Sequence, residues 1–293
     1  MKGKNGVHHG GLTEAVTGFF GKEGALAGAK GYESRPGQAK MAGKVAEVIE
    51  GKRHLVVEAG TGTGKSLAYL VPAAYAAGEL GRKAIVSTYT IHLQEQLFGK
   101  DVPIVQSLVP FEFTAALLKG RQNYLCPHRL KKAQAQQWEL FAAGQAEQLK
   151  GLVEWAGRTR DGTLSDLDFS VDAAVWAQVC SEAFACTPRH CGGANGCFYQ
   201  KARAAILDAN VVIVNHALLF GLLAGLEQEE ESPDEGYLFP NDFLILDEAH
   251  EVEDVAAKAL GLEVRLGSLR FLLQRLVDPR TKRSEEHTAE LQS

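Results

Sequence analysis

The chain lacks a hydrophobic run that is long enough to cross a membrane. Its longest apolar-rich segment, near Leu67–Gly78, has about half of the roughly 20 residues that a membrane-spanning helix needs. The opening segment, Met1–Leu12, contains charge and glycine but no apolar stretch of the kind that a secretory signal requires. These absences argue against membrane and secreted proteins, so we expect a cytoplasmic protein with no membrane partner.

The chain also lacks an excess of basic residues. Its formal net charge is −5, whereas nucleic-acid binders usually present a basic face. Two acidic segments account for the negative sign, Glu227–Glu235 and the final stretch Arg283–Ser293, and the remainder is mildly basic. The charge therefore neither indicates nor excludes a nucleic-acid partner. Residues Glu227–Gly236 are expected to form a solvated loop.

Cysteine is scarce, and cytosolic thiols stay reduced, so the five cysteines are not expected to form disulfides. Clustered cysteines in that compartment indicate metal or redox chemistry instead. Cys186, Cys191 and Cys197 follow a C-x4-C-x5-C pattern, and Cys126 far upstream supplies a fourth thiolate. Four cysteines suit tetrahedral zinc or an iron–sulfur cluster, but zinc sites usually show tight C-x2–4-C pairs. The spacing favours iron–sulfur and leaves a structural zinc module with four cysteine ligands as the alternative.

Short apolar runs alternate with stretches of helical period, which is typical of an α/β domain with a parallel sheet. The predicted strands are Leu55–Glu58, Ala84–Ser87, Val211–Asn215 and Phe243–Asp247, with Phe113–Leu118 as a possible fifth. Gln38–Glu50 is predicted to be a helix, because its apolar residues recur at helical spacing. From Lys119 to Arg203 the alternation is interrupted by a helical stretch at Arg129–Arg158 and by the cysteine cluster. We interpret this block as an insertion in the sheet domain.

A glycine-rich loop follows the first predicted strand and precedes a helix-like stretch, which is the context that a P-loop requires. The loop consists of Ala59, Gly60, Thr61, Gly62, Thr63, Gly64, Lys65 and Ser66. Small residues let backbone N–H groups surround phosphate oxygens at a helix N-terminus. Lys65 is expected to neutralise the phosphate charge of ATP, and the Ser66 hydroxyl to bind Mg²⁺. Ala59 replaces the first glycine of the strict pattern, a departure that is common in helicase-type P-loops.

A DEAH sequence, Asp247–His250, ends the last predicted strand. Acidic residues at the carboxyl end of a strand lie where open α/β sheets bind ligands. Asp247 is expected to hold Mg²⁺, and Glu248 to orient and deprotonate the attacking water. His250 completes the box as a further candidate catalytic residue. An acidic pair after a strand is common by itself, but a P-loop upstream makes it the expected partner.

Together these motifs resemble those of superfamily 2 DNA helicases of the XPD/DinG type, most closely the bacterial DinG-like members. Further segments match the family's motifs in order: Arg35–Gln38 the adenine-recognising motif, Ser87–Thr90 with Leu93–Leu97 motif Ia, Lys119–Cys126 and Cys197–Arg203 the segments with the first and last cluster cysteines, and Ala209–Leu218 the strand before the DEAH box. The resemblance covers about Arg35 to Leu260.

The resemblance implies a RecA-like P-loop NTPase domain with an inserted, mainly helical iron–sulfur domain. It implies a [4Fe–4S] cluster whose ligands are Cys126, Cys186, Cys191 and Cys197, with Cys180 as the spare cysteine. Gln38 would recognise the adenine of ATP, and motif Ia would contact single-stranded DNA. The implied enzyme is a monomeric ATP-dependent helicase that moves 5′ to 3′ on single-stranded DNA and unwinds forked duplex DNA.

Basic residues that flank Cys126 are hypothesised to contact DNA phosphates, because positive charge supplies most of the non-specific affinity for DNA. They are Lys119, Arg121, Arg129, Lys131 and Lys132.

The resemblance also implies a division of the chain. Residues 1–118 and 206–260 form the two parts of the motor domain, 119–205 the iron–sulfur insertion, and 261–282 the start of an arch domain with a helix at Leu262–Pro279. Residues 283–293 resemble a translated sequencing adapter, with Ala289 as the one departure, and are expected to be an artefact. Because the family continues into a second RecA-like domain that supplies arginine fingers, we expect this chain alone to be inactive.

Overall fold

A computed structural model of the chain describes residues 11–29, 31–137, 141, 143–182, 196–226 and 242–261, together with Leu266 and Leu273. A four-stranded parallel sheet forms its centre, with the strand order β2-β3-β1-β4. The strands are β1 (Ala84–Thr88), β2 (Ala115–Leu117), β3 (Val211–Asn215) and β4 (Phe243–Leu246). In register, Val86 of β1 lies beside Ile213 of β3 and Ile245 of β4. The predicted α/β class and parallel sheet are confirmed.

Both faces of the central strands β1 and β3 are buried, which explains why these strands are continuous apolar runs. Successive side chains of a strand point to opposite faces. Accordingly, Val86 and Ile213 belong to one hydrophobic core, whereas Ile85 and Val212 belong to a second core on the other face.

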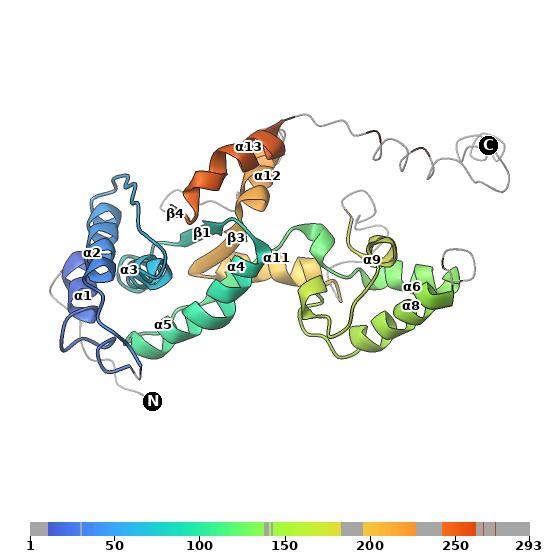
Figure 1. The fold of residues 1–293 in the computed structure, drawn as a ribbon, viewed down its shortest axis with the longest axis horizontal. Coiled ribbons are helices and arrows are strands. Elements are labelled where there is room, and N and C mark those ends of the chain that lie inside the picture. The colour runs from blue at the N-terminus through green and yellow to red at the C-terminus, as the bar shows by residue number, and fades with distance from the viewer. Residues whose placement is uncertain are drawn as a thin grey trace.

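The helices divide between these two cores. The first core is packed by α1 (Leu12–Phe19), α2 (Pro36–Glu50), α3 (Lys65–Leu80) and α5 (Val102–Leu108). The second is packed by α6 (Pro127–Ala135), α8 (Ala143–Ala156), α9 (Ala173–Val179), α11 (Phe198–Asp208) and α12 (His216–Leu226). Figure 1 shows α1 to α3 at one end of the molecule and α6, α8 and α9 at the other, with the sheet between them. The remaining α-helices are α4 (Ile91–Gln96) and α13 (Val252–Leu260).

Two predicted helical regions are confirmed, because α2 covers Gln38–Glu50 and the stretch Arg129–Arg158 contains most of α6 and α8. Helix α1 was not predicted. The acidic loop Glu227–Gly236 and the adapter-like tail lie outside the described residues, as does Leu262–Pro279 except for Leu266 and Leu273.

The predicted strand Leu55–Glu58 is wrong for this structure. These residues join no ladder in the described part of the chain, and the side chain of Val56 is 97% exposed. The physical reason is pairing: a strand requires a hydrogen-bonded neighbour. Strand β4 is one edge of the described sheet, and its Leu244 is 43% exposed.

Candidate active site

The glycine-rich loop ends where α3 begins, at Lys65. Gly62 and Gly64 have φ angles of +78° and +81°, a left-handed conformation that glycine adopts without steric cost. Gly60 to Gly62 are exposed and the loop lies at the N-terminus of a 16-residue helix. Such an end combines unpaired backbone N–H groups with a favourable helix dipole, so it can hold an anion such as a phosphate.

Two side chains that precede the loop in sequence, Arg35 and Gln38, donate hydrogen bonds to its backbone carbonyls. The Gln38 amide nitrogen donates to the Gly64 carbonyl at 2.9 Å, and the Gln38 amide oxygen accepts from the Tyr32 hydroxyl at 3.2 Å. The Arg35 guanidinium donates to the Gly62 carbonyl at 2.8 Å. A Cβ atom at Gly64 would collide with the Gln38 amide, so this position requires glycine for space as well as for its φ angle. Gln38 is 2% exposed, and its recognition of adenine stays a prediction.

The DEAH segment reaches the same place from the end of β4. The Lys65 ammonium lies 3.0 Å from a Glu248 carboxylate oxygen, a contact between residues that are 183 positions apart. Glu248 has a φ angle of +53°, which is uncommon for a residue with a side chain and marks the sharp turn after the strand. The Tyr69 hydroxyl of α3 donates to Asp247 at 3.2 Å. The predicted meeting of P-loop and DEAH box is therefore present in the structure.

Negative charge accumulates around Ser66. Its hydroxyl hydrogen-bonds the side chains of Tyr69 and Asp101. Burial raises the pKa of Asp101, and burial together with the charge of Glu248 raises the pKa of Asp247. Desolvated carboxylates that raise one another's pKa are stabilised by a cation, since it offsets the repulsion of their ionised forms.

These oxygen donors suit Mg²⁺, which prefers carboxylates, hydroxyls, water and phosphate oxygens. Among the residues that the structure describes, no three His, Cys, Asp or Glu side chains are grouped closely enough to hold a metal by themselves. The binding of Mg²⁺ by Ser66 and Asp247 stays a prediction.

A buried histidine, His216, hydrogen-bonds both strand β1 and the DEAH turn. Nδ1 of His216 lies 2.7 Å from the Ser87 hydroxyl of β1, and Nε2 lies 3.0 Å from the Asp247 carbonyl. A carbonyl only accepts, so Nε2 carries the proton and a neutral ring accepts from Ser87 through Nδ1. Burial lowers the pKa of His216, which favours this neutral form.

His250 lies at the rim of the site with a side chain that is 69% exposed. Its ring nitrogens are 3.6 Å from Glu248 and 3.5 Å from Glu251. Three residues of the site were not predicted as its members: Tyr69, Asp101 and His216. His216 falls within the Ala209–Leu218 segment, immediately after a strand, so its position carried a usable signal. Tyr69 lies one helical turn after Ser66 on α3, so its spacing also carried a signal, whereas Asp101 carried none, because only folding brings it to Ser66.

Two of the predicted cluster cysteines, Cys126 and Cys197, are within the described residues, whereas Cys186 and Cys191 lie outside them. Each described cysteine directly precedes a helix, α6 and α11 respectively. The rings of Tyr124 and Tyr199 pack edge to face with their centroids 5.6 Å apart. Since each tyrosine is two residues from a cysteine, this contact holds the two cysteine segments together. Helix N-termini favour thiolates, so both positions suit iron–sulfur or zinc ligation.

Cys180 lies beside Cys126 in the fold. Leu125 and Cys180 form an antiparallel bridge, and the Cys126 N–H donates to the Val179 carbonyl at 2.8 Å. Both cysteines are buried, and burial raises the pKa of the Cys180 thiol. The role of Cys180 as the spare cysteine stays a prediction.

The hypothesis that five basic residues near Cys126 contact phosphates is wrong for Lys119, which is 3% exposed and hydrogen-bonded within the protein. Arg121 stacks on the ring of Tyr199, and Arg129 donates to the carbonyls of Cys180 and Ala177. The side chains of Lys119, Arg121 and Arg129 are therefore used in contacts within the protein. The exposed residues of the set are Lys131 and Lys132.

Comparison with known proteins relates the chain to helicases. Residues 35–135 match the DEAD/DEAH box helicase family. The chain is 36% identical over 249 residues to the ATP-dependent DNA helicase YoaA of Haemophilus influenzae, covering 84% of this chain and 37% of that protein. It is 38% identical over 286 residues to the ATP-dependent helicase DinG of Mycobacterium tuberculosis, covering 90% of this chain and 42% of the relative. The chain thus spans less than half the length of these relatives. Among its described helices, none is both long and apolar enough to span a bilayer.

Proposed function

We propose that this chain, which belongs to the DinG-type DEAD/DEAH box helicases, is the ATP-binding part of an enzyme that hydrolyses ATP to move along DNA. One observation carries the proposal, the 3.0 Å contact between Lys65 of the P-loop and Glu248 of the DEAH box. It brings a phosphate-binding group and a general base to one place. The names of the relatives, which are ATP-dependent helicases, support DNA as the substrate on which this ATP site acts.

In this proposal each polar group of the site has a separate task. Backbone N–H groups of Ala59 to Gly64 hold the phosphates, and Lys65 neutralises their charge. Ser66 and Asp247 bind Mg²⁺, and Glu248 accepts a proton from the attacking water. His250, next to Glu248 at the rim, is a further catalytic residue in this proposal, and Gln38 recognises the adenine of ATP.

The contact between Lys65 and Glu248 also suggests how the base is controlled. Lys65 has a side chain that is 30% exposed, so it can turn towards phosphate oxygens at the loop. When it does, it releases the Glu248 carboxylate, which then accepts a hydrogen bond from water. Phosphate binding and the freeing of the general base are thus the same movement.

We further propose that Cys126, Cys186, Cys191 and Cys197 hold a [4Fe–4S] cluster in an insertion at residues 119–205 between the motor parts 1–118 and 206–260. The cluster would cross-link the two cysteine segments and supply one-electron redox chemistry. The support is the placement of Cys126 and Cys197 at helix N-termini and the tyrosine contact between their segments. For the whole enzyme we propose a monomer that moves 5′ to 3′ and unwinds forked duplex DNA.

The experiment measures nucleotide and DNA binding by anaerobically purified chain, together with its iron, sulfide and zinc content. We expect Mg²⁺-dependent ATP binding, affinity for single-stranded DNA that falls with salt, and about four iron and four sulfide ions per chain with a broad absorption at about 400 nm. If the purified protein is colourless and contains zinc, the proposed cluster is wrong and the four cysteines form a zinc module. Absence of ATP binding by the anaerobically purified chain would overturn the proposal.

A further inference from the structure

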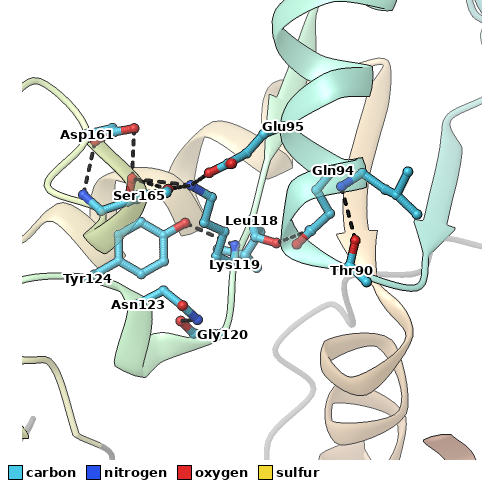
Figure 2. Close-up of polar contacts among 12 residues, drawn as sticks. Thr90, Gln94, Glu95, Leu118, Lys119, Gly120, Asn123, Tyr124, Asp161 and Ser165 are labelled. Atoms are coloured by element: carbon cyan, nitrogen blue, oxygen red, sulfur yellow. Dashed lines mark hydrogen bonds and ion pairs between the residues drawn. The ribbon is translucent and has the colours of Figure 1, made fainter. Parts of the chain in front are cut away.

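A buried lysine joins the motor sheet to the segment that carries the first predicted cluster cysteine. Lys119 follows β2 closely and its side chain is 3% exposed. Its ammonium donates to Glu95 at 2.6 Å, to Ser165 at 2.6 Å and to Thr163 at 3.2 Å. An ammonium has three donors, so each has a partner. Figure 2 shows the side chain extended between Glu95 and Ser165.

Glu95 belongs to α4, and α4 makes a second contact to the same part of the chain. The Gln94 amide donates to the carbonyl of Leu118 at 3.0 Å, and Gln94 is fully buried. Gln94 and Glu95 are neighbours on α4, and they contact the neighbouring residues Leu118 and Lys119. Gln94 binds the backbone carbonyl of Leu118, and Glu95 binds the charged side chain of Lys119 (Figure 2). These two contacts therefore tie α4 to Leu118 and Lys119.

The other side of Lys119 leads to the cysteines. Its backbone N–H donates to the Tyr124 hydroxyl at 3.0 Å. The Tyr124 ring contacts that of Tyr199, and the two tyrosines precede Cys126 and follow Cys197 by two residues. Consecutive contacts thus connect α4 with both described cysteine segments through this one lysine.

The energetics of buried charges indicate that Lys119 serves to fix the position of its neighbours. Replacing a buried ion pair with apolar groups is often neutral for stability, whereas removing one partner is costly. A hydrophobic residue at position 119 would fill the space but would not fix the distance and direction of Glu95. Burial alone would raise the pKa of Glu95, but the hydrogen bonds and charge around it lower the pKa, so the Glu95 carboxylate is ionised at neutral pH and accepts from Lys119.

We propose that Lys119 is a positioning residue that locks α4 against the cysteine-bearing insertion, so that single-stranded DNA meets one preformed surface. That surface would run from the start of α4, where Thr90 caps the helix, to the exposed Lys131 and Lys132 on α6. The inference rests on the proposed function for its DNA arm. A preformed surface binds more tightly than two independently moving parts, because less freedom is lost on binding.

The test compares Lys119→Met with Lys83→Met in the complete chain. Lys83 is the matched control, because its ammonium also lies against the protein and donates to the carbonyls of Ile206 and Leu207, at the opposite end of β1. Hydrogen exchange reports the lock directly. In Lys119→Met we expect the amides of Gln94 and Leu125 to lose at least about tenfold more protection than that of Val86 in β1, which reports global unfolding. Lys83→Met should leave Gln94 and Leu125 protected.

Binding measurements supply the second arm. Lys119→Met should weaken binding to single-stranded DNA at least about tenfold, with ATP affinity changed less than about twofold. Glu95→Gln retains an acceptor and should be milder, and the double variant Glu95→Gln/Lys119→Met should equal Lys119→Met alone, as expected for one shared interaction. Equal losses of ATP and DNA affinity would show a merely structural role and overturn the proposal.

The two arms separate this inference from the proposed function. If the unmodified chain binds no single-stranded DNA, the proposed function fails, and hydrogen exchange alone decides whether Lys119 is the lock. If Gln94 and Leu125 stay protected in Lys119→Met, the inference is wrong even when DNA binding is intact.

Discussion

Two lysine–glutamate pairs of this molecule have similar chemistry and different surroundings. Lys65 and Glu248 are 3.0 Å apart, with side chains that are 30% and 31% exposed. Lys119 and Glu95 are 2.6 Å apart, but the lysine is only 3% exposed while the glutamate is 32% exposed. In the described part of the chain, Lys65 donates to Glu248 alone, whereas Lys119 fills all three donor positions.

The difference separates a group that can move from a group that cannot. Water can replace either partner of the Lys65 pair, so the contact is worth little in stability and can be exchanged for a phosphate. If Lys119 left its site, its ammonium would lose three hydrogen bonds and would gain no stronger partner. The accessible lysine therefore suits a reaction cycle, and the buried one suits a fixed junction.

The largest expected effect is the loss of stability on changing Lys119 to Met. Breaking a buried pair costs about 3 kcal/mol in the free energy of unfolding, at the lower end of its usual range because Glu95 keeps contact with water. Urea denaturation measures it, with Lys44→Met as the control, since the Lys44 side chain is 57% exposed beside Glu47. A loss below about 1 kcal/mol would erase the distinction between the two pairs.

The next effect concerns Lys65→Ala and appears in nucleotide binding. Losing a charge-assisted contact of about 1.5–3 kcal/mol weakens ATP binding roughly 10–100-fold. The free energy of unfolding should change by less than about 1 kcal/mol, because the pair is partly exposed. Calorimetric titration with ATP and Mg²⁺ checks the first value and urea denaturation the second. Unchanged ATP affinity would remove Lys65 from the site.

The same contrast shows what could be predicted from the sequence. The P-loop and the DEAH box were predicted together with strands β1, β3 and β4, because each is encoded by a short run of neighbouring residues. Glycines with positive φ, such as Gly62 and Gly64, and an apolar strand that ends in an acid are local signals.

Features that depend on distant neighbours were not predictable in this way. Lys119 in a basic segment suggested a phosphate contact, but folding brings Glu95, Thr163 and Ser165 around it. The apolar run Leu55–Glu58 suggested a strand, and it has no partner strand in the described part of the chain. Composition predicts that a residue is charged or apolar, but only the arrangement of other segments decides whether it is buried.

A smaller effect is expected from His216→Ala, which tests whether His216 fixes the DEAH turn that carries Glu248, the partner of Lys65. The substitution removes the link between Ser87 and the Asp247 carbonyl and leaves a buried hydroxyl without that partner. We expect a loss of about 1–2 kcal/mol in stability and a weaker ATP affinity through a displaced DEAH turn. His216→Asn, which retains an amide donor and an acceptor, should recover part of both. If His216→Ala binds ATP normally, the turn is held by β4 alone.

The smallest expected effect is a pH dependence that belongs to the same histidine. Because burial lowers the pKa of His216 below its ordinary value of 6.5, the folded state resists protonation more than the unfolded state does. The contribution of His216 is therefore fully present above pH 6.5, falls as the pH drops below that value, and levels off beneath the folded pKa. Denaturation at about pH 7.5 and about pH 5.5 should show a larger stability loss for the unmodified chain than for His216→Asn. An equal loss in both would mean that the pKa of the ring is the same in the folded and unfolded chain, and a smaller loss in the unmodified chain would mean that the ring is charged within the fold, with Nδ1 donating to Ser87.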